Sequence, residues 1–124
     1  MKTAKDYLAD ANAVITRISS EDAIAKHATG AGLWIDVRDS NDIAASGTIK
    51  GAKRVPRGFM EFAADPALPH HKDFMQKDAE IYLVCGAGGQ AALAGKTLYD
   101  MGYSNVTNVG GIGDWKTAGG PTEA

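Results

Sequence analysis

Apolar residues form short runs along the chain, and segments with helical spacing separate these runs. The run LWIDV (33–37), bounded by turn formers, has the pattern of a strand that is covered on both faces in a parallel sheet. AEIYLV (79–84) is the clearest strand candidate. Shorter strands are predicted over 13–19, 53–56 and 105–109.

The helices predicted between these strands differ in clarity. The clearest is QAALAGKTLYDMG (90–102), with Gly102 at its C-cap position. Its predicted core-facing residues are Ala92, Leu93, Thr97, Leu98 and Met101. Further helical segments are predicted over 4–12, 19–28, 39–47, 58–65 and 111–120, and the last of them is expected to bury Trp115. This alternation predicts an α/β fold: a mostly parallel central sheet of about five short strands, flanked by helices on both faces.

Composition and charge exclude several classes of protein. With 124 residues, 44% of them apolar and 23% charged, the chain has the size and balance of one soluble globular domain. A net charge of -2, with no block of Lys and Arg, argues against nucleic acid as a partner. No apolar run approaches the roughly 20 residues that span a membrane, and the N-terminus lacks a signal-peptide core. A single cysteine suits a reducing compartment, so the cytoplasm is the expected location.

Candidate chemistry gathers at the carboxyl ends of the predicted strands, where ligands bind in open parallel sheets. Arg38, Arg57, Cys85 and the pair Gly110–Gly111 each follow one of these strands. We therefore expect two cations, one thiol and flexible backbone to meet at one edge of the sheet.

Cys85 opens a loop of small residues before the clearest helix. The loop residues are Gly86, Ala87, Gly88, Gly89 and Gln90. Such a loop can turn successive N–H groups inward and form an anion-binding nest at the positive end of a helix dipole. These groups favour the thiolate, which is the nucleophilic form of cysteine. The alternative is an inert core cysteine next to glycines that serve a tight turn.

Three other motifs do not support a cofactor or a metal. The spacing Gly86-x-Gly88-x-x-Ala91 fits a dinucleotide fingerprint, but the following strand offers no acidic residue for the ribose. The GKT triplet at 95–97 lies inside a predicted helix and lacks the first glycine of a phosphate-binding loop. His70 and His71 are adjacent and have no second ligand cluster, so no metal site is expected. We expect no cofactor.

Three ordered motifs resemble the rhodanese family. LWIDVRDSNDIAASGTIKGAKRVP is similar to the family's IDVR strand, acidic helix and GHIxGAxxxP motif; the cysteine loop follows; and LYDMGYSNVTNVGGIGDWKTAGGP is similar to LxxxGYxxVxxLxGGxxxWxxxGxP. The resemblance covers roughly 14–121. It implies a single rhodanese-like domain over 1–124, with its core at about 14–121 and a helical arm at 1–13. It also implies that Cys85 carries a persulfide.

The middle segment VPRGFMEFAADPALPHHKDF resembles a subgroup of small single-domain bacterial rhodanese-like proteins. This resemblance makes Arg57 a candidate substrate-binding residue, with a solvated loop cation as the alternative. Arg38 is a second candidate for binding substrate, although Asp36 and Arg38 together favour a structural ion pair.

The sequence departs from the family pattern at three positions. Gln90 and Ala91 stand where the family usually has Arg and then Ser, and Thr48 replaces the usual His of GHI. Loss of the loop arginine removes a contact of about 1.5–3 kcal/mol, so thiosulfate is expected to bind about ten- to a hundredfold more weakly. Backbone N–H groups do not depend on that side chain, so stabilisation of a persulfide should survive.

The resemblance and the residues together predict a sulfurtransferase or persulfide carrier. Cys85 would take sulfur from a small sulfur-containing anion or a persulfide, and would pass it to a thiol, a protein thiol or cyanide. The alternative is a rhodanese-like binding or redox-sensing module without turnover. A cysteine phosphatase or arsenate reductase is less favoured, because Ala91 occupies the position of their loop arginine.

Overall fold

The computed structural model describes residues 1–124 and has a five-stranded, wholly parallel sheet at its centre. The strands follow the order β1-β6-β5-β2-β4 across the sheet. Their bounds are β1 Thr16–Arg17, β2 Leu33–Asp36, β4 Lys53–Arg54, β5 Ile81–Cys85 and β6 Val106–Gly111. β5 pairs with β2 on one side and with β6 on the other. The predicted α/β fold with about five short strands is confirmed.

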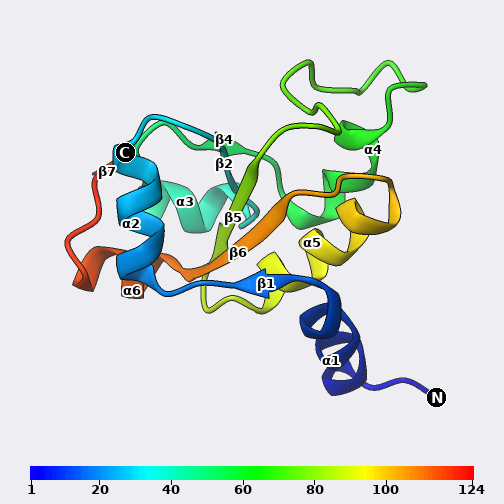
Figure 1. Ribbon diagram of the computed structural model, residues 1–124, viewed down its shortest axis with the longest axis horizontal. Coiled ribbons are helices and arrows are strands. Elements are labelled where there is room, and N and C mark those ends of the chain that lie inside the picture. Colours follow the sequence, from blue (N-terminus) through cyan, green and yellow to red (C-terminus); the bar gives the residue numbers. More distant parts are fainter.

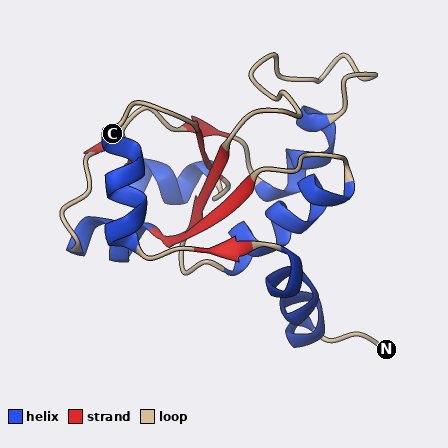
Figure 2. Cartoon of the chain, viewed as in Figure 1, coloured by secondary structure: helices blue, strands red, loops and turns tan.

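Helices cover both faces of this sheet (Figures 1 and 2). Their bounds are α1 Ala4–Val14, α2 Ser20–Ala28, α3 Ser40–Ser46, α4 Met60–Ala64, α5 Gly89–Asp100 and α6 Ile112–Thr117. In Figure 1, α2 and α6 lie to the left of the sheet, whereas α4 and α5 lie to the right. A 3-10 turn, η1 Arg57–Phe59, precedes α4. A separate antiparallel pair joins β3 Thr48–Ile49 to β7 Thr122–Glu123.

The period-two alternation of β5 divides the interior into two apolar clusters. Ile81, Leu83 and Cys85 face the larger cluster, which contains buried residues of α4 and α5. Tyr82 and Val84 face the smaller cluster, which contains Ala23 of α2 and Ile112 and Trp115 of α6. Trp115 is fully buried, as predicted. The side chain of Cys85 therefore points toward the helix that follows it.

The core-facing side of α5 differs from the prediction. The buried residues of this helix are Ala91, Ala92, Ala94, Gly95 and Leu98. Leu93, Thr97 and Met101 are only half-buried, but Met101 still packs against the larger apolar cluster, so Ala92, Leu98 and Met101 of the predicted set contribute to the core-facing side. A Cβ on Gly95 would lie 3.1 Å from Cγ2 of Ile15, which immediately follows α1. The helix packs tightly because its buried face is made of small residues.

The predicted boundaries of two other elements also shifted. The strand expected over 13–19 shortens to β1 because α1 continues to Val14. The predicted helix over 58–65 begins as η1 and becomes α-helical at Met60. The helix predicted over 19–28 is α2, and Ser19 caps it by accepting a hydrogen bond from the backbone N–H of Asp22. No helix of the structure combines the length and the apolar character needed to cross a membrane.

Tyr82 is buried and stacks on Trp34, with ring centroids 4.3 Å apart. Burial, followed by a hydrogen bond to Glu80 and the charge of that carboxylate, raises the pKa of Tyr82 from 10.0 to about 12. The folded state therefore holds this proton more tightly than the unfolded state. The resulting stability is complete below pH 10 and is lost as the pH rises through about 12.

We expect the free energy of unfolding to fall by about 2–3 kcal/mol between pH 10 and 12 through Tyr82. Urea unfolding across this range measures the slope. Tyr82→Phe should flatten that slope, and Glu80→Gln should move it to lower pH. An unchanged slope in Tyr82→Phe would assign the pH dependence to other groups, of which Tyr103, whose pKa burial also raises, is the first candidate.

Candidate active site

Cys85 lies at the carboxyl end of the central strand, with its sulfur covered by the residues that follow. The residue is 1% exposed, although Gly86 and Ala87 next to it are exposed. The backbone N–H of Gly88 donates to Sγ at 3.0 Å, and that of Ala91 donates to Sγ at 3.3 Å. The sulfur therefore accepts two backbone hydrogen bonds from the loop that it begins.

The loop can enclose the sulfur because Gly88 adopts a left-handed conformation. Gly88 has φ +103 and is the N-cap residue of α5, the helix that starts at Gly89. Ala91 is the third residue of the helix, so its N–H has no partner within the helix. Sγ takes the place of a capping side chain, and the positive end of the helix dipole favours negative charge on it.

Asn108 fixes this loop to the neighbouring strand β6. The side chain is 1% exposed, its Nδ2 donates to the carbonyl of Gly88 at 2.9 Å, and its Oδ1 accepts from the N–H of Gly110 at 2.8 Å. One buried amide thus connects the loop after β5 with the end of β6. Sequence reasoning missed Asn108, and the available signal was a polar residue in a short apolar strand.

The predicted pair Gly110–Gly111 does meet the cysteine loop. Cys85 is in register with Gly111, next to an irregularity in the pairing of β5 and β6. A Cβ on Gly111 would collide with the carbonyl oxygen of Gly86. Glycine is required at position 111 because the backbone of the loop approaches β6 too closely for a side chain.

Arg38 lies in a buried structural network instead of the cysteine loop. Its guanidinium contacts both oxygens of Asp36, with Nη2–Oδ2 at 2.8 Å, and it donates to Ser46 Oγ and to the carbonyl of Gly47. Thr48 also donates to Asp36, at 2.7 Å. The guanidinium compensates a buried carboxylate, which is the structural ion pair that the sequence favoured, and the possible contact of Arg38 with substrate stays a prediction. Thr48, at the position of the family's His, belongs to the same network.

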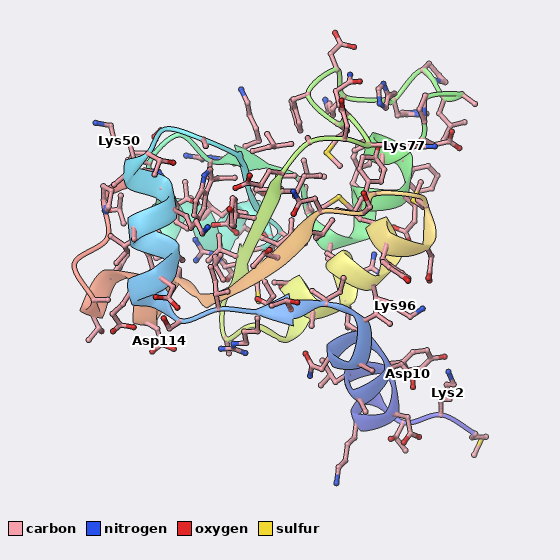
Figure 3. The ribbon with its side chains drawn as sticks, viewed as in Figure 1. Lys2, Asp10, Lys50, Lys77, Lys96 and Asp114 are labelled. Carbon is pink, nitrogen blue, oxygen red and sulfur yellow. The ribbon has the colours of Figure 1, made fainter.

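Arg57 also points away from the cysteine loop. It donates to Glu61 at 3.1 Å and to Thr97 of α5 at 3.0 Å. Thr97 lies seven residues after Gln90, which is about two turns along α5. Arg57 lines a cavity of about 240 Å³ together with Lys2, Asp10 and Lys96, three residues that Figure 3 places around α1 and α5. Its predicted contact with substrate has no support in this geometry.

The remaining candidate residues, Gln90, His70 and His71, form few contacts that bear on the site. Gln90 is exposed and its side chain forms no hydrogen bond within the protein, so its predicted contact with a donor stays a prediction. The ring of His70 packs edge-on against Phe59 and Phe62. His71 Nε2 contacts the carbonyl of Met75 at 3.1 Å. No group of three His, Cys, Asp or Glu side chains comes together to hold a metal ion.

A cation that the sequence analysis did not single out lies against the loop. Arg17 of β1 is exposed, and its guanidinium fills the space where side chains on Gly88 and Gly110 would stand. Both glycines have positive φ, +103 and +86. The candidate site therefore consists of Cys85, the backbone of 86–91, Asn108, the Gly110–Gly111 turn and Arg17.

The fold and the site together define a class of protein. It has a parallel sheet covered by helices, and a cysteine at the end of the central strand lies inside a loop of backbone hydrogen-bond donors. The sequence model described as "Rhodanese-like domain" matches residues 19–118. The chain belongs to the rhodanese-like domain family, as its motifs predicted.

Individual relatives agree with this assignment. The thiosulfate sulfurtransferase PspE of Escherichia coli is 31% identical over 81 residues, which are 65% of this chain and 71% of PspE. The adenylyltransferase and sulfurtransferase UBA4 of Candida albicans is 43% identical over 53 residues, 42% of this chain, but the match spans only 12% of that longer protein. A solved structure from Rhodopseudomonas palustris, a protein of unknown function and possible tyrosine phosphatase, has a TM-score of 0.94 at 39% identity, covering 99% of this chain and 96% of that one.

Proposed function

We propose that this protein is a sulfurtransferase or persulfide carrier that works through Cys85. Membership of the rhodanese-like family and similarity to a thiosulfate sulfurtransferase support a function of the sulfurtransferase type. The observation that carries the proposal is the pair of backbone N–H groups that donate to Sγ. Donors fixed in this way stabilise negative charge on sulfur, first on the thiolate and then on the persulfide.

The proposed reaction has two displacements. The Cys85 thiolate attacks the outer sulfur of the donor, the Sγ–S bond forms, and the donor's own sulfur bond breaks with its electron pair leaving on the donor anion. Sulfite is that leaving group when thiosulfate is the donor. A thiolate or cyanide then attacks the outer sulfur, and Cys85 departs as the thiolate. The two steps balance without an external oxidant or reductant.

The alternative, a binding or redox-sensing module, rests on two observations. The loop lacks the family's arginine, and Cys85 is almost fully covered. The low exposure of Cys85 does not distinguish the two proposals, because the sulfur of a persulfide carrier at the base of such a loop would also be shielded from solvent. A phosphatase needs a loop cation, and Ala91 is a buried alanine whose N–H already contacts the sulfur. The sulfur chemistry therefore remains our first proposal, in a reducing compartment such as the cytoplasm where the single cysteine stays a thiol.

The test is sulfur loading measured by intact mass without reductant. Reduced protein is incubated with thiosulfate, and separately with a low-molecular-weight persulfide, alongside a Cys85→Ser control. We expect the parent protein to gain one sulfur atom and the control to gain none. Cyanide should remove the added sulfur and form thiocyanate. The persulfide is expected to load faster than thiosulfate, because the loop arginine is absent.

Two results would contradict the proposal. Equal loading of Cys85→Ser would place the sulfur elsewhere. If neither donor adds sulfur while Cys85 still reacts with an alkylating reagent, the carrier function fails and the redox-sensing alternative gains support.

A further inference from the structure

The guanidinium of Arg17 is held beside the cysteine loop by the shape of two glycines. A Cβ on Gly88 would collide with Nη1 of Arg17, and a Cβ on Gly110 would lie 3.0 Å from Nη2. These two glycines belong to the loop after β5 and to the end of β6, the segments that Asn108 connects. Arg17 lies on β1 in register with Asn108, and its guanidinium extends over the place where these two segments meet.

Arg17 differs from the other three arginines in having no partner. Arg38 pairs with Asp36, Arg57 pairs with Glu61, and Arg54 donates to the carbonyl of Ala124. The guanidinium of Arg17 forms neither a salt bridge nor a hydrogen bond within the protein. Its guanidinium therefore has its five donors free, in a geometry suited to two oxygens of one anion.

The distance from this guanidinium to the sulfur suits a small anion. Gly88 contacts Arg17 Nη1 on one side and donates to Sγ at 3.0 Å on the other, which places Nη1 at most about 8 Å from Sγ. A thiolate attacks from about 3–3.5 Å. A sulfur–sulfur bond is about 2 Å long, and a charge-assisted contact to oxygen is about 2.8 Å. These lengths add up to about the same 8 Å, so a donor whose anionic group follows one sulfur–sulfur bond is long enough to span the distance from Sγ to the Arg17 guanidinium.

We infer that Arg17 is a substrate-binding residue of the cysteine site, which receives the oxyanion group of the sulfur donor in place of the absent loop arginine. The inference rests on the proposed function for the identity of the donor. In the first displacement, Arg17 would hold the oxygens of thiosulfate and then of the departing sulfite. Arg17 would thereby restore part of the anion recognition that is lost when Gln90 stands in place of the loop arginine.

The surroundings of Arg17 limit the size of the effect. Arg17 lines a cavity of about 390 Å³ with Ser19, Ser20, Glu21 and Asp114, between α2, β6 and α6. Figure 3 shows Asp114 on the α6 side of this region. The two carboxylates lower the positive potential, so the cavity favours an anion only next to the guanidinium. We therefore expect a moderate, salt-sensitive preference for anions over neutral molecules.

The test compares two alkylating reagents that share a reactive carbon and a leaving group. Iodoacetate carries a carboxylate and iodoacetamide a neutral amide, so the ratio of their rates at Cys85 reports the charge beside the sulfur. We expect this ratio to fall about fivefold or more in Arg17→Gln, and to stay above half of the parent value in Arg17→Lys. Arg54→Gln is the matched control, because it removes one arginine charge from β4, at the opposite edge of the sheet from β1, where the guanidinium donates to the carbonyl of Ala124, and it should leave the ratio unchanged. Added salt should lower the ratio in the parent and hardly affect Arg17→Gln.

The same variants are then loaded with thiosulfate, where Arg17→Gln should be about tenfold slower. Equal unfolding midpoints of parent and variants confirm that the fold is kept. An unchanged ratio in Arg17→Gln, an equal fall in Arg54→Gln, or a Cys85 that reacts with neither reagent would each overturn the inference. If neither thiosulfate nor the low-molecular-weight persulfide loads the parent protein but the ratio still falls only in Arg17→Gln, the proposed function fails and anion recognition by Arg17 stands.

Discussion

Replacing Asp36 by alanine is expected to lower the free energy of unfolding by about 3–5 kcal/mol. Asp36 is fully buried and accepts hydrogen bonds from Arg38 and Thr48. Its removal leaves the guanidinium of Arg38, which is 5% exposed, without its compensating charge inside the protein. The loss is large because a buried charge without a partner strongly destabilises the folded state. Replacing both members of a buried ion pair by apolar residues changes the free energy of unfolding much less.

Urea unfolding of the parent and three variants tests this expectation. The double variant Asp36→Leu with Arg38→Met should lose less stability than Asp36→Ala, because it removes both charges. Asp42→Ala, on the exposed first turn of α3, is the control and should cost less than about 1 kcal/mol. A loss below about 1 kcal/mol in Asp36→Ala would show that Arg38 finds water or another partner, and would contradict the structural role assigned to the pair.

Replacing Asn108 by leucine should cost about 2–4 kcal/mol of stability and also slow sulfur loading. Leucine matches the size of asparagine but leaves the carbonyl of Gly88 and the N–H of Gly110 without partners in a buried region. Each unsatisfied group costs about 1–3 kcal/mol. Because Gly88 also donates to Sγ, any movement of the loop weakens one of the two contacts that hold negative charge on the sulfur.

Asn105→Leu is the matched control, since Asn105 is exposed just before β6. It should change stability by less than about 0.5 kcal/mol and leave loading unchanged. Stability and sulfur loading report two different roles of Asn108, support of the fold and positioning of the loop. Loading is compared without urea, where both variants are folded. If Asn108→Leu loses stability but loads sulfur at the parent rate, Asn108 supports the fold without positioning the loop.

The strands and the cysteine loop were predictable because their signals are local. A continuous apolar run ends at Cys85, glycines follow, and a helix begins, so the position of the thiol at a sheet edge follows from the sequence. The buried face of α5 was less predictable, because large apolar side chains usually mark the buried face of a helix, whereas a closely packed helix buries its small residues. Ala94 and Gly95 are buried while the larger Leu93 is half-buried, since Ile15 needs the space above Gly95.

The residues that complete the site were missed because their roles depend on contacts between distant segments. Arg17 lies on an edge strand, and nothing near it in the sequence shows that it reaches the loop after β5. Asn108 is polar within a strand, a pattern that by itself does not reveal which backbone groups it binds. Conversely, Arg38 and Arg57 were expected at the site because both follow strands, but carboxylates nearby in the sequence, Asp36 and Glu61, hold them elsewhere.

The central place of β5 has a consequence for how long a loaded sulfur survives. The strand is hydrogen-bonded on both sides, and the loop after it is connected to β6 through Asn108 and the contact between Gly86 and Gly111. Local opening of such a segment requires separation of the middle of the sheet, so its free energy approaches that of global unfolding. The amides of Gly88 and Ala91 should accordingly be among the slowest to exchange with deuterium. Under the proposed function, a sulfur atom on Cys85 leaves only when an acceptor attacks it and the Cys85 thiolate departs, and because thermal opening of the loop is rare, that attack takes place on the closed loop.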